Sequence, residues 1–198
     1  MTPEVRYFPP DYFRKLEKAE IFPDPGRPLE IDLGCGDGGF LVAMAARHPE
    51  RNFLGVERLL GRVRKVCRKA ERASLTNVKV LRLESSYALE WLLPDSCASR
   101  VHLLFPDPWP KKKHHKRRLV TAEFCTALVR VLAPGGEFLF KTDHREYFEQ
   151  SLAPLEENSD LQPEDWPGDA FFYPQTDFER IWREEGRRVY SARFKVSD

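Results

Sequence analysis

Apolar and polar residues alternate along this chain in a way that predicts repeated strand–helix units. Short apolar runs typical of buried strands end at turn or acidic residues, and each is followed by a stretch with the 3.6-residue spacing of a helix. Such repetition with short connections predicts an α/β fold with a doubly wound, mostly parallel sheet that binds ligands at the carboxyl ends of its strands. The expected strands are 29–33, 52–56, 78–83, 100–105 and 137–142, and the expected helices are 38–47, 59–74, 86–92, 120–132 and 145–155.

The first part of the chain lacks this regular alternation. Residues 1–28 carry six prolines and one short helix-like piece, 11–20, whose apolar stripe is Tyr12, Phe13 and Leu16. With 198 residues, of which 41% are apolar, the chain can bury one good core but not two. The predicted organisation is an N-terminal arm at 1–28 and one domain at 29–198.

The last part of the chain carries signals of its own. Residues 153–169 are acidic and loop-like, and a short strand is expected at 170–173. Thr176 followed by Glu179 is typical of a capping box, which marks the start of a helix. The remaining expected elements are a helix over 178–185 and a final antiparallel strand over 188–196.

Charge is distributed unevenly along the chain. The net charge is +1, yet the eight residues from Lys111 to Arg118 hold six cations, which leaves the remainder net acidic. A basic patch of this kind indicates a surface where a polyanion docks, with a solvated loop as the alternative. The patch follows an apolar strand, an acid between two prolines (Asp107) and an aromatic ring (Trp109). This corner suits capture of a flat base between phosphates; Trp109 either stacks on the base or fills the corner.

The cysteines and the apolar runs exclude several classes of protein. Cys35, Cys67, Cys97 and Cys125 form no CxxC pair, which favours reduced thiols over a metal site or disulfides. No apolar run approaches the roughly 18 residues that span a bilayer, and the N-terminus lacks the apolar core of a signal peptide. We therefore expect a cytoplasmic protein with no membrane partner and no metal.

A glycine-rich turn follows the first strand of the main domain. Gly34, Gly36 and Gly38 allow close approach of a ligand to the backbone. Glu57 ends the next strand, 19 residues beyond Gly38, where a carboxylate can bind both ribose hydroxyls of an adenosine. Glu84 ends the third strand and either binds the adenine amino group or caps the following helix.

The acids around this turn favour one adenosine cofactor over another. A dinucleotide places its pyrophosphate here and requires positive potential, whereas Glu30, Asp32 and Asp37 surround the turn. S-adenosylmethionine has no phosphate and carries two cationic groups, so the pattern predicts this cofactor over NAD(P). The alternative is that Glu30 and Asp32 are paired with arginines, because burying unpaired carboxylates costs several kcal/mol.

In these motifs the chain resembles the bacterial tRNA (guanine-N7-)-methyltransferases, which methylate a guanine of the tRNA variable loop with S-adenosylmethionine. The resemblance implies a Rossmann-like class I methyltransferase fold and covers about 29–196. The matching pieces are Leu29-Glu30-Ile31 with the glycine turn, Gly55-Val56-Glu57, Phe105-Pro106-Asp107-Pro108-Trp109-Pro110-Lys111, His115-Lys116-Arg117-Arg118, Thr142-Asp143 and Thr176-Asp177-Phe178-Glu179.

The resemblance also implies roles for individual residues. Position 32 is Asp where the family often has Gly, position 84 is Glu where Asp is usual, and the N-terminal arm is short. Together with the glycine turn, the expected cofactor contacts are Glu30, Gly34, Gly36, Glu57, Glu84 and Asp107. The expected tRNA contacts are Lys111, Asp143, Thr176, Asp177, Phe178 and Glu179.

The implied chemistry requires little of the protein beyond alignment. Guanine N7 has an in-plane lone pair and no proton to lose, so methyl transfer needs no general base, only orientation and stabilisation of the charge on the guanine. Asp107, the expected catalytic residue, or Asp143 would hold the guanine edge. The rivals are methylation of another RNA base and a non-catalytic RNA-binding protein, and the oligomer is expected to be a monomer or a homodimer.

Overall fold

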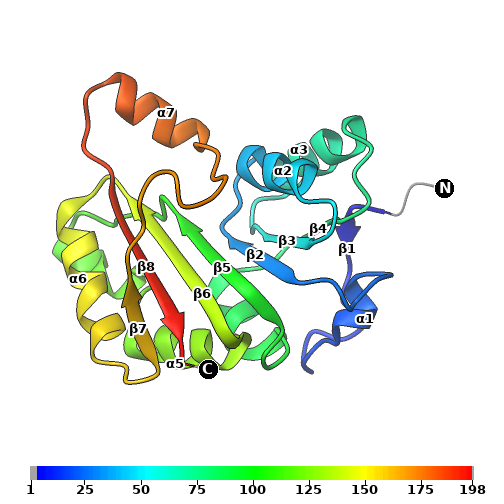
Figure 1. Ribbon diagram of the computed structural model, residues 1–198, viewed down its shortest axis with the longest axis horizontal. Helices are drawn as coiled ribbons and strands as arrows, with labels where there is room; N and C mark the ends of the chain where they lie inside the picture. Colours follow the sequence, from blue (N-terminus) through cyan, green and yellow to red (C-terminus); the bar gives the residue numbers. More distant parts are fainter. Residues whose placement is uncertain (1–3, 198) are drawn as a thin grey trace.

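One eight-stranded sheet forms the centre of the protein in the computed structural model, which describes residues 4–197 (Figure 1). The strand order is β1-β4-β3-β2-β5-β6-β8-β7, and the strands are parallel except for β8, which is antiparallel to both β6 and β7. The doubly wound sheet with an antiparallel final strand is therefore confirmed. The strands are β1 (Arg6–Tyr7), β2 (Leu29–Leu33), β3 (Asn52–Val56), β4 (Val78–Leu81), β5 (Ala98–Leu104), β6 (Leu132–Thr142), β7 (Leu161–Glu164) and β8 (Tyr190–Val196).

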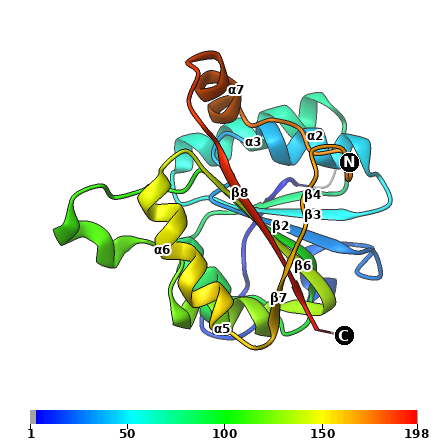
Figure 2. The same cartoon turned by 60° about the vertical axis from the view of Figure 1, so that its left-hand side comes forward.

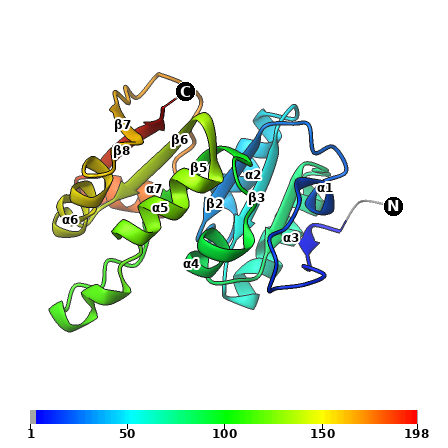
Figure 3. The same ribbon diagram turned by 90° about the horizontal axis from the view of Figure 1, so that it is seen from below.

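Helices cover both faces of this sheet (Figures 1 and 3). On one face, α2 and α3 pack with Phe53 and Val80 in one apolar cluster; on the other, η1, α5 and α6 pack with Ile31 and Phe138 in a second. Because the central strands are buried on both faces, their sequences are nearly continuous apolar runs. The helices are α1 (Lys18–Ile21), α2 (Gly39–Arg47), α3 (Leu60–Arg72), α4 (Ser85–Tyr87), the π-helix η1 (Ala88–Leu92), the 3₁₀-helix η2 (Lys112–Arg117), α5 (Ala122–Val131), α6 (Arg145–Glu156) and α7 (Asp177–Glu184).

The order of the strands determines where a ligand can bind. The chain runs outward from β2 through β3 to β4 and then returns to β5 on the other side of β2. The connections after β2 and β5 therefore leave in opposite directions, which opens a crevice at the carboxyl ends of these two strands. The glycine turn follows β2 and the Pro-Asp-Pro-Trp corner follows β5, so the two motifs meet there.

The predicted strand at 170–173 is wrong. Within the described residues this segment is coil, and the edge strand is β7, inside the stretch predicted as an acidic loop. The aromatic residues that imitate a strand pattern instead cover the sheet surface: the Phe171 ring lies 4.2 Å from the Arg100 guanidinium and 5.5 Å from that of Arg193. We call residues 165–175, which cross from β7 to α7, the strap.

The N-terminal arm packs onto the sheet. Residues 6–7 form β1, which pairs with β4 at the edge of the sheet. The expected helix at 11–20 is largely wrong, because the helix begins at Lys18. Leu16 is 1% exposed, whereas Phe13 is 93% exposed, so the predicted apolar stripe does not form one face. No helix in residues 4–197 is both long and apolar enough to cross a membrane.

The arm yields a prediction about stability. Leu16→Ala removes a fully buried side chain and should lower the free energy of unfolding by about 2–5 kcal/mol. Phe13→Ala, in the same predicted stripe, should change it by less than about 0.5 kcal/mol, because that ring is in solvent. Urea unfolding of both variants is the measurement; equal losses would contradict the packing described for the arm.

Candidate active site

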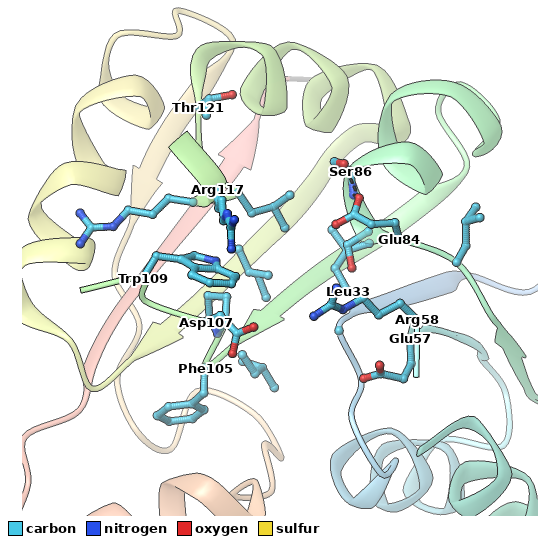
Figure 4. A pocket seen from close by; sticks show the side chains of 18 of the residues that line it. Leu33, Glu57, Arg58, Glu84, Ser86, Phe105, Asp107, Trp109, Arg117 and Thr121 are labelled. Carbon is cyan, nitrogen blue, oxygen red and sulfur yellow. Dashed lines mark hydrogen bonds between the residues drawn. The ribbon is translucent and has the colours of Figure 1, made fainter. Parts of the chain in front are cut away.

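Two adjoining cavities lie at the carboxyl ends of β2, β3 and β5. The larger has a volume of about 690 Å³ and the smaller about 120 Å³, and Gly34 and Asp107 line both. The larger cavity is also lined by Glu57, Arg58, Glu84, Trp109 and Arg117 (Figure 4). The smaller is also lined by Asp32, Gly36, Thr176, Asp177 and Phe178. The structure thus brings together eight of the predicted site residues.

The glycine turn leaves space for a ligand above its backbone. Gly34 and Gly36 have φ angles of +77° and +57°, and a Cβ atom on either would meet no atom within 4 Å. Gly38 has a different role, since a Cβ there would lie 2.9 Å from a Val66 methyl. The first two glycines therefore keep the cavities open, while the third allows α2 to approach α3.

The two carboxylates expected to bind adenosine line the larger cavity. Glu57, at the end of β3, is 4% exposed, and its Oε1 accepts a hydrogen bond from the Leu59 amide at 2.8 Å. Glu84 accepts from the Ser86 amide at 2.9 Å and from the Ser86 hydroxyl. Of the two predictions made for Glu84, the helix cap is therefore present, and the same side chain also faces the cavity.

The Pro-Asp-Pro-Trp corner is conformationally strained. Phe105 and Trp109 have φ angles of +52° and +44°, a region that non-glycine residues rarely adopt and that costs of order 1–3 kcal/mol each. Between them the exposed Asp107 side chain faces both cavities. The Trp109 ring carries the Arg117 guanidinium 4.8 Å from its centre (Figure 4). Trp109 thus joins the corner to the basic segment that follows.

That basic segment extends away from the body of the protein. Residues 111–118, which we call the basic arm, contain η2 and appear as the green projection at the left of Figure 2. Lys112, Lys113 and Lys116 are exposed. Arg118 is only 3% exposed and donates to the Pro108 carbonyl at 2.9 Å and to Gln150. Arg118 therefore holds the corner in place; it also lines the larger cavity, and a phosphate contact by this residue stays a prediction.

Asp32 is a site residue that the sequence analysis did not assign. It is 2% exposed, lines the smaller cavity, and forms no salt bridge within residues 4–197. Burial, reinforced by the negative charge of Glu57, raises the pKa of Asp32 to about 7. The signal in the sequence was an acid in a strand buried on both faces, a position where a carboxylate is unfavourable unless it is paired with a cation or serves a ligand.

Glu30 has different surroundings. Its carboxylate is 1% exposed, accepts from Arg51 at 2.8 Å and lies 2.9 Å from Nε2 of His102. Nδ1 of His102 lies 2.8 Å from the Tyr173 hydroxyl, so this network also holds the strap. The alternative of pairing with arginine is thus realised for Glu30. Glu30 lines neither of the two cavities, so its direct contact with the cofactor stays a prediction.

The predicted tRNA residues divide into two groups. Thr176, Asp177 and Phe178 line the smaller cavity. Thr176 Oγ1 accepts from the Glu179 amide at 3.0 Å, which confirms the predicted helix start at α7. Only this half of the predicted capping box is formed, because the Glu179 carboxylate pairs with Lys141 and Arg183.

The other group lies away from the cavity linings. Glu179 is buried and paired with Lys141 at 3.0 Å and Arg183 at 2.8 Å, which fastens α7 to β6. Lys111 is exposed at the start of the basic arm, and Asp143 lies 3.6 Å from Arg187. Direct contact of these three residues with substrate stays a prediction.

The cysteines lie apart from this chemistry. All four are free. Burial raises the pKa of Cys97 to about 12 and that of Cys125 to about 11, so both remain thiols at neutral pH and are poor nucleophiles. Among residues 4–197, no group of three His, Cys, Asp or Glu side chains is placed to hold a metal ion.

The doubly wound sheet, with a glycine turn after β2 and acids at the ends of β3, β4 and β5, has the Rossmann-like fold of class I methyltransferases. Solved structures with this fold include the antibiotic-resistance methyltransferase Kmr, at 21% identity with a TM-score of 0.59 over 86% of this chain and 87% of that one. The 16S rRNA methyltransferase KamB is 19% identical, with a TM-score of 0.63 over 86% and 88% of the two chains. At these identities the likeness shows the fold alone.

Sequence comparison identifies the family. The family described as "Putative methyltransferase" matches residues 26–192. A tRNA (guanine-N(7)-)-methyltransferase of Leptospira interrogans is 35% identical over 92% of this chain and 88% of its own length. That of Halorhodospira halophila is 38% identical over 85% and 75%. The chain belongs to the tRNA (guanine-N(7)-)-methyltransferase family.

The raised pKa of Asp32 predicts a pH dependence of stability. Its folded pKa lies above the ordinary value, so the cofactor-free native state binds the extra proton, and ionisation of Asp32 costs stability as pH rises from about 4 to about 7. Asp32→Asn removes this cost. Its free energy of unfolding relative to the parent should therefore rise between pH 5 and pH 8, by roughly 2 kcal/mol.

Urea unfolding across this pH range is the measurement. Asp37→Asn is the matched control, because Lys69 lies 2.9 Å from Asp37 and that carboxyl has a lowered pKa. The difference in free energy of unfolding between Asp37→Asn and the parent should stay constant between pH 5 and pH 8. An equally flat difference for Asp32→Asn would show that the carboxyl ionises normally.

Proposed function

We propose that this protein transfers a methyl group from S-adenosylmethionine to N7 of a guanine in the variable loop of tRNA. The observation that carries the proposal is the position of Asp107. Its side chain lines both cavities of the carboxylate-lined crevice, and the exposed basic arm begins a few residues further along the chain. Family membership supports the same activity, because the curated relatives are tRNA (guanine-N(7)-)-methyltransferases. A cytoplasmic enzyme that is a monomer or a homodimer is consistent with this substrate.

The residues at the crevice fit S-adenosylmethionine. The backbone of Gly34 and Gly36 faces open space, and the nearby charged groups are mainly acids, which suit a cation and not a pyrophosphate. Glu57 would bind the ribose hydroxyls, Glu84 the adenine, and Asp32 the cationic end. When bound, the cofactor supplies a methyl group on a positively charged sulfur. Binding of this cation would also stabilise the ionised form of Asp32.

The protein's own contribution is to align and stabilise the base. Asp107 would accept hydrogen bonds from guanine N1–H and N2–H₂, fixing the ring and favouring positive charge on it. Because the strained corner and buried Arg118 fix its backbone, Asp107 needs little reorganisation on binding. Lys112, Lys113 and Lys116 would bind phosphates without reading sequence. Lys111, Asp143 and residues 176–179 remain the proposed contacts to the rest of the nucleotide.

Methyl transfer to an unmodified tRNA, followed by mass analysis of the nucleosides, tests the proposed function. The expected product is 7-methylguanosine from the variable loop. A methyl group on another base would replace the guanine N7 assignment. Tight tRNA binding with no transfer, and no S-adenosylmethionine binding by calorimetry, would favour a non-catalytic RNA-binding protein.

Asp107→Ala should reduce kcat by on the order of 10²–10³ with the fold intact, because it removes one preorganised electrostatic contact to the reacting base. Glu57→Gln is the comparison, since it should weaken cofactor binding by roughly 1.5–3 kcal/mol with a smaller effect on kcat at saturation. Steady-state kinetics and cofactor titration separate the two. Near-parental kcat in Asp107→Ala would remove this residue from the mechanism.

A further inference from the structure

The basic arm is matched in charge by a second basic segment of the molecule. The residues from Arg58 to Arg72, which comprise α3 and its entry, contain seven Lys and Arg and one carboxylate, Glu71. The net charge of this segment equals that of the basic arm. It is not apparent from the net charge of the whole chain, because acidic residues elsewhere balance it. The proposed methyl transfer assigns no role to most of these cations.

The fold places these cations on one surface. Val63, Val66 and Ala70 of α3 are buried against the sheet, and the opposite face carries exposed cations. Arg62 lies 3.7 Å from Glu57 and Lys69 lies 2.9 Å from Asp37. The four others on the helix form no salt bridge within residues 4–197 and are Arg64, Lys65, Arg68 and Arg72.

These four cations, which we call the α3 row, repel one another in the free protein. Arg64, Arg68 and Arg72 follow one another at intervals of four residues, and like charges at this spacing destabilise a helix by about 0.2–0.5 kcal/mol per pair. The repulsion is relieved when a polyanion binds. A helix of 13 residues is about 20 Å long, which spans several consecutive phosphates.

The row is continuous with the proposed active site. Arg58 and Arg62 line the larger cavity, as do Lys116 and Arg117 of the basic arm. Figure 4 shows Arg58 beside Glu57 and Glu84 on one side of the cavity, and Arg117 above Trp109 on the other. The cavity therefore lies between two basic segments, so a nucleic acid whose base enters it can contact both.

We infer that the exposed face of α3 is a second docking surface for tRNA, which binds the phosphate backbone of a helical arm next to the loop that enters the cavity. This inference rests on the proposed function. A nucleic acid is the favoured ligand of this surface because the α3 row lies beside a cavity suited to a base. Cations spaced along a helix can also neutralise successive phosphates of a nucleic acid backbone.

The test compares two triple variants of equal charge. Arg64, Lys65 and Arg68 are changed to Gln in the α3 variant, which leaves the cavity-lining Arg58 and Arg62 in place. Lys15, Arg27 and Arg47 are changed to Gln in the control; Lys15 and Arg47 are exposed, Arg27 is half-buried, and none of the three lines either cavity. Binding to one tRNA transcript is measured across a salt series, together with methyl transfer and cofactor affinity.

The α3 variant should bind tRNA about tenfold or more weakly near 0.15 M salt, and its slope of log affinity against log salt should be shallower by up to about three units. The control should match the parent, and both variants should keep the parental cofactor affinity and kcat at saturating tRNA. If the parent methylates tRNA and the parent and α3 variant have equal salt slopes, α3 is not a docking surface for tRNA. The proposed function would be unaffected by that result.

Two further outcomes also decide against the inference. If the α3 variant loses binding to anionic lipid vesicles but not to tRNA, the surface serves a membrane. If the control loses as much tRNA affinity as the α3 variant, the effect is one of net charge and not of a defined surface. A parent that binds tRNA without methylating it would count against the proposed function, while the binding series would still measure the contribution of α3.

Discussion

Two carboxylates in the central strand impose the main constraint on this molecule. Every residue of β2 is buried, and the strand carries Glu30 and Asp32. Buried charge is tolerated when it is paired and hydrogen-bonded. Glu30 satisfies this through Arg51 and His102, which in turn contacts Tyr173 of the strap. Asp32 has no such cation in residues 4–197 and faces a cavity, so its compensation is left to a cationic ligand.

The remaining site follows from this arrangement. The strap held by Tyr173 leads into Thr176, whose hydroxyl caps α7, and α7 is fastened to β6 by Glu179 and Lys141. On the other side, Arg118 binds the Pro108 carbonyl and fixes the strained corner that presents Asp107. Contacts of buried charged residues thus position both walls, while exposed cations on the basic arm and α3 remain available to bind phosphates.

Much of the fold could be predicted because periodicity reports burial directly. The apolar strands, the glycine turn and the Thr176 cap depend on local sequence, and the structure has them near the expected positions. The failures are long-range: Phe171 and Tyr173 have strand-like spacing but pack against side chains from β5 and β8. Likewise, no local pattern distinguishes buried Arg118 from exposed Arg117, or paired Glu30 from Asp32, because their partners come from distant segments.

The central claim is that one carboxylate-lined crevice receives both the cofactor and the guanine. It is tested most directly by a crystal structure of the protein with demethylated cofactor and tRNA. We expect the ribose hydroxyls on Glu57, the guanine edge on Asp107 with N7 directed at the cofactor sulfur, and phosphates on the basic arm. A cofactor bound away from Glu57, or a guanine held by Asp143 with Asp107 in solvent, would contradict this account.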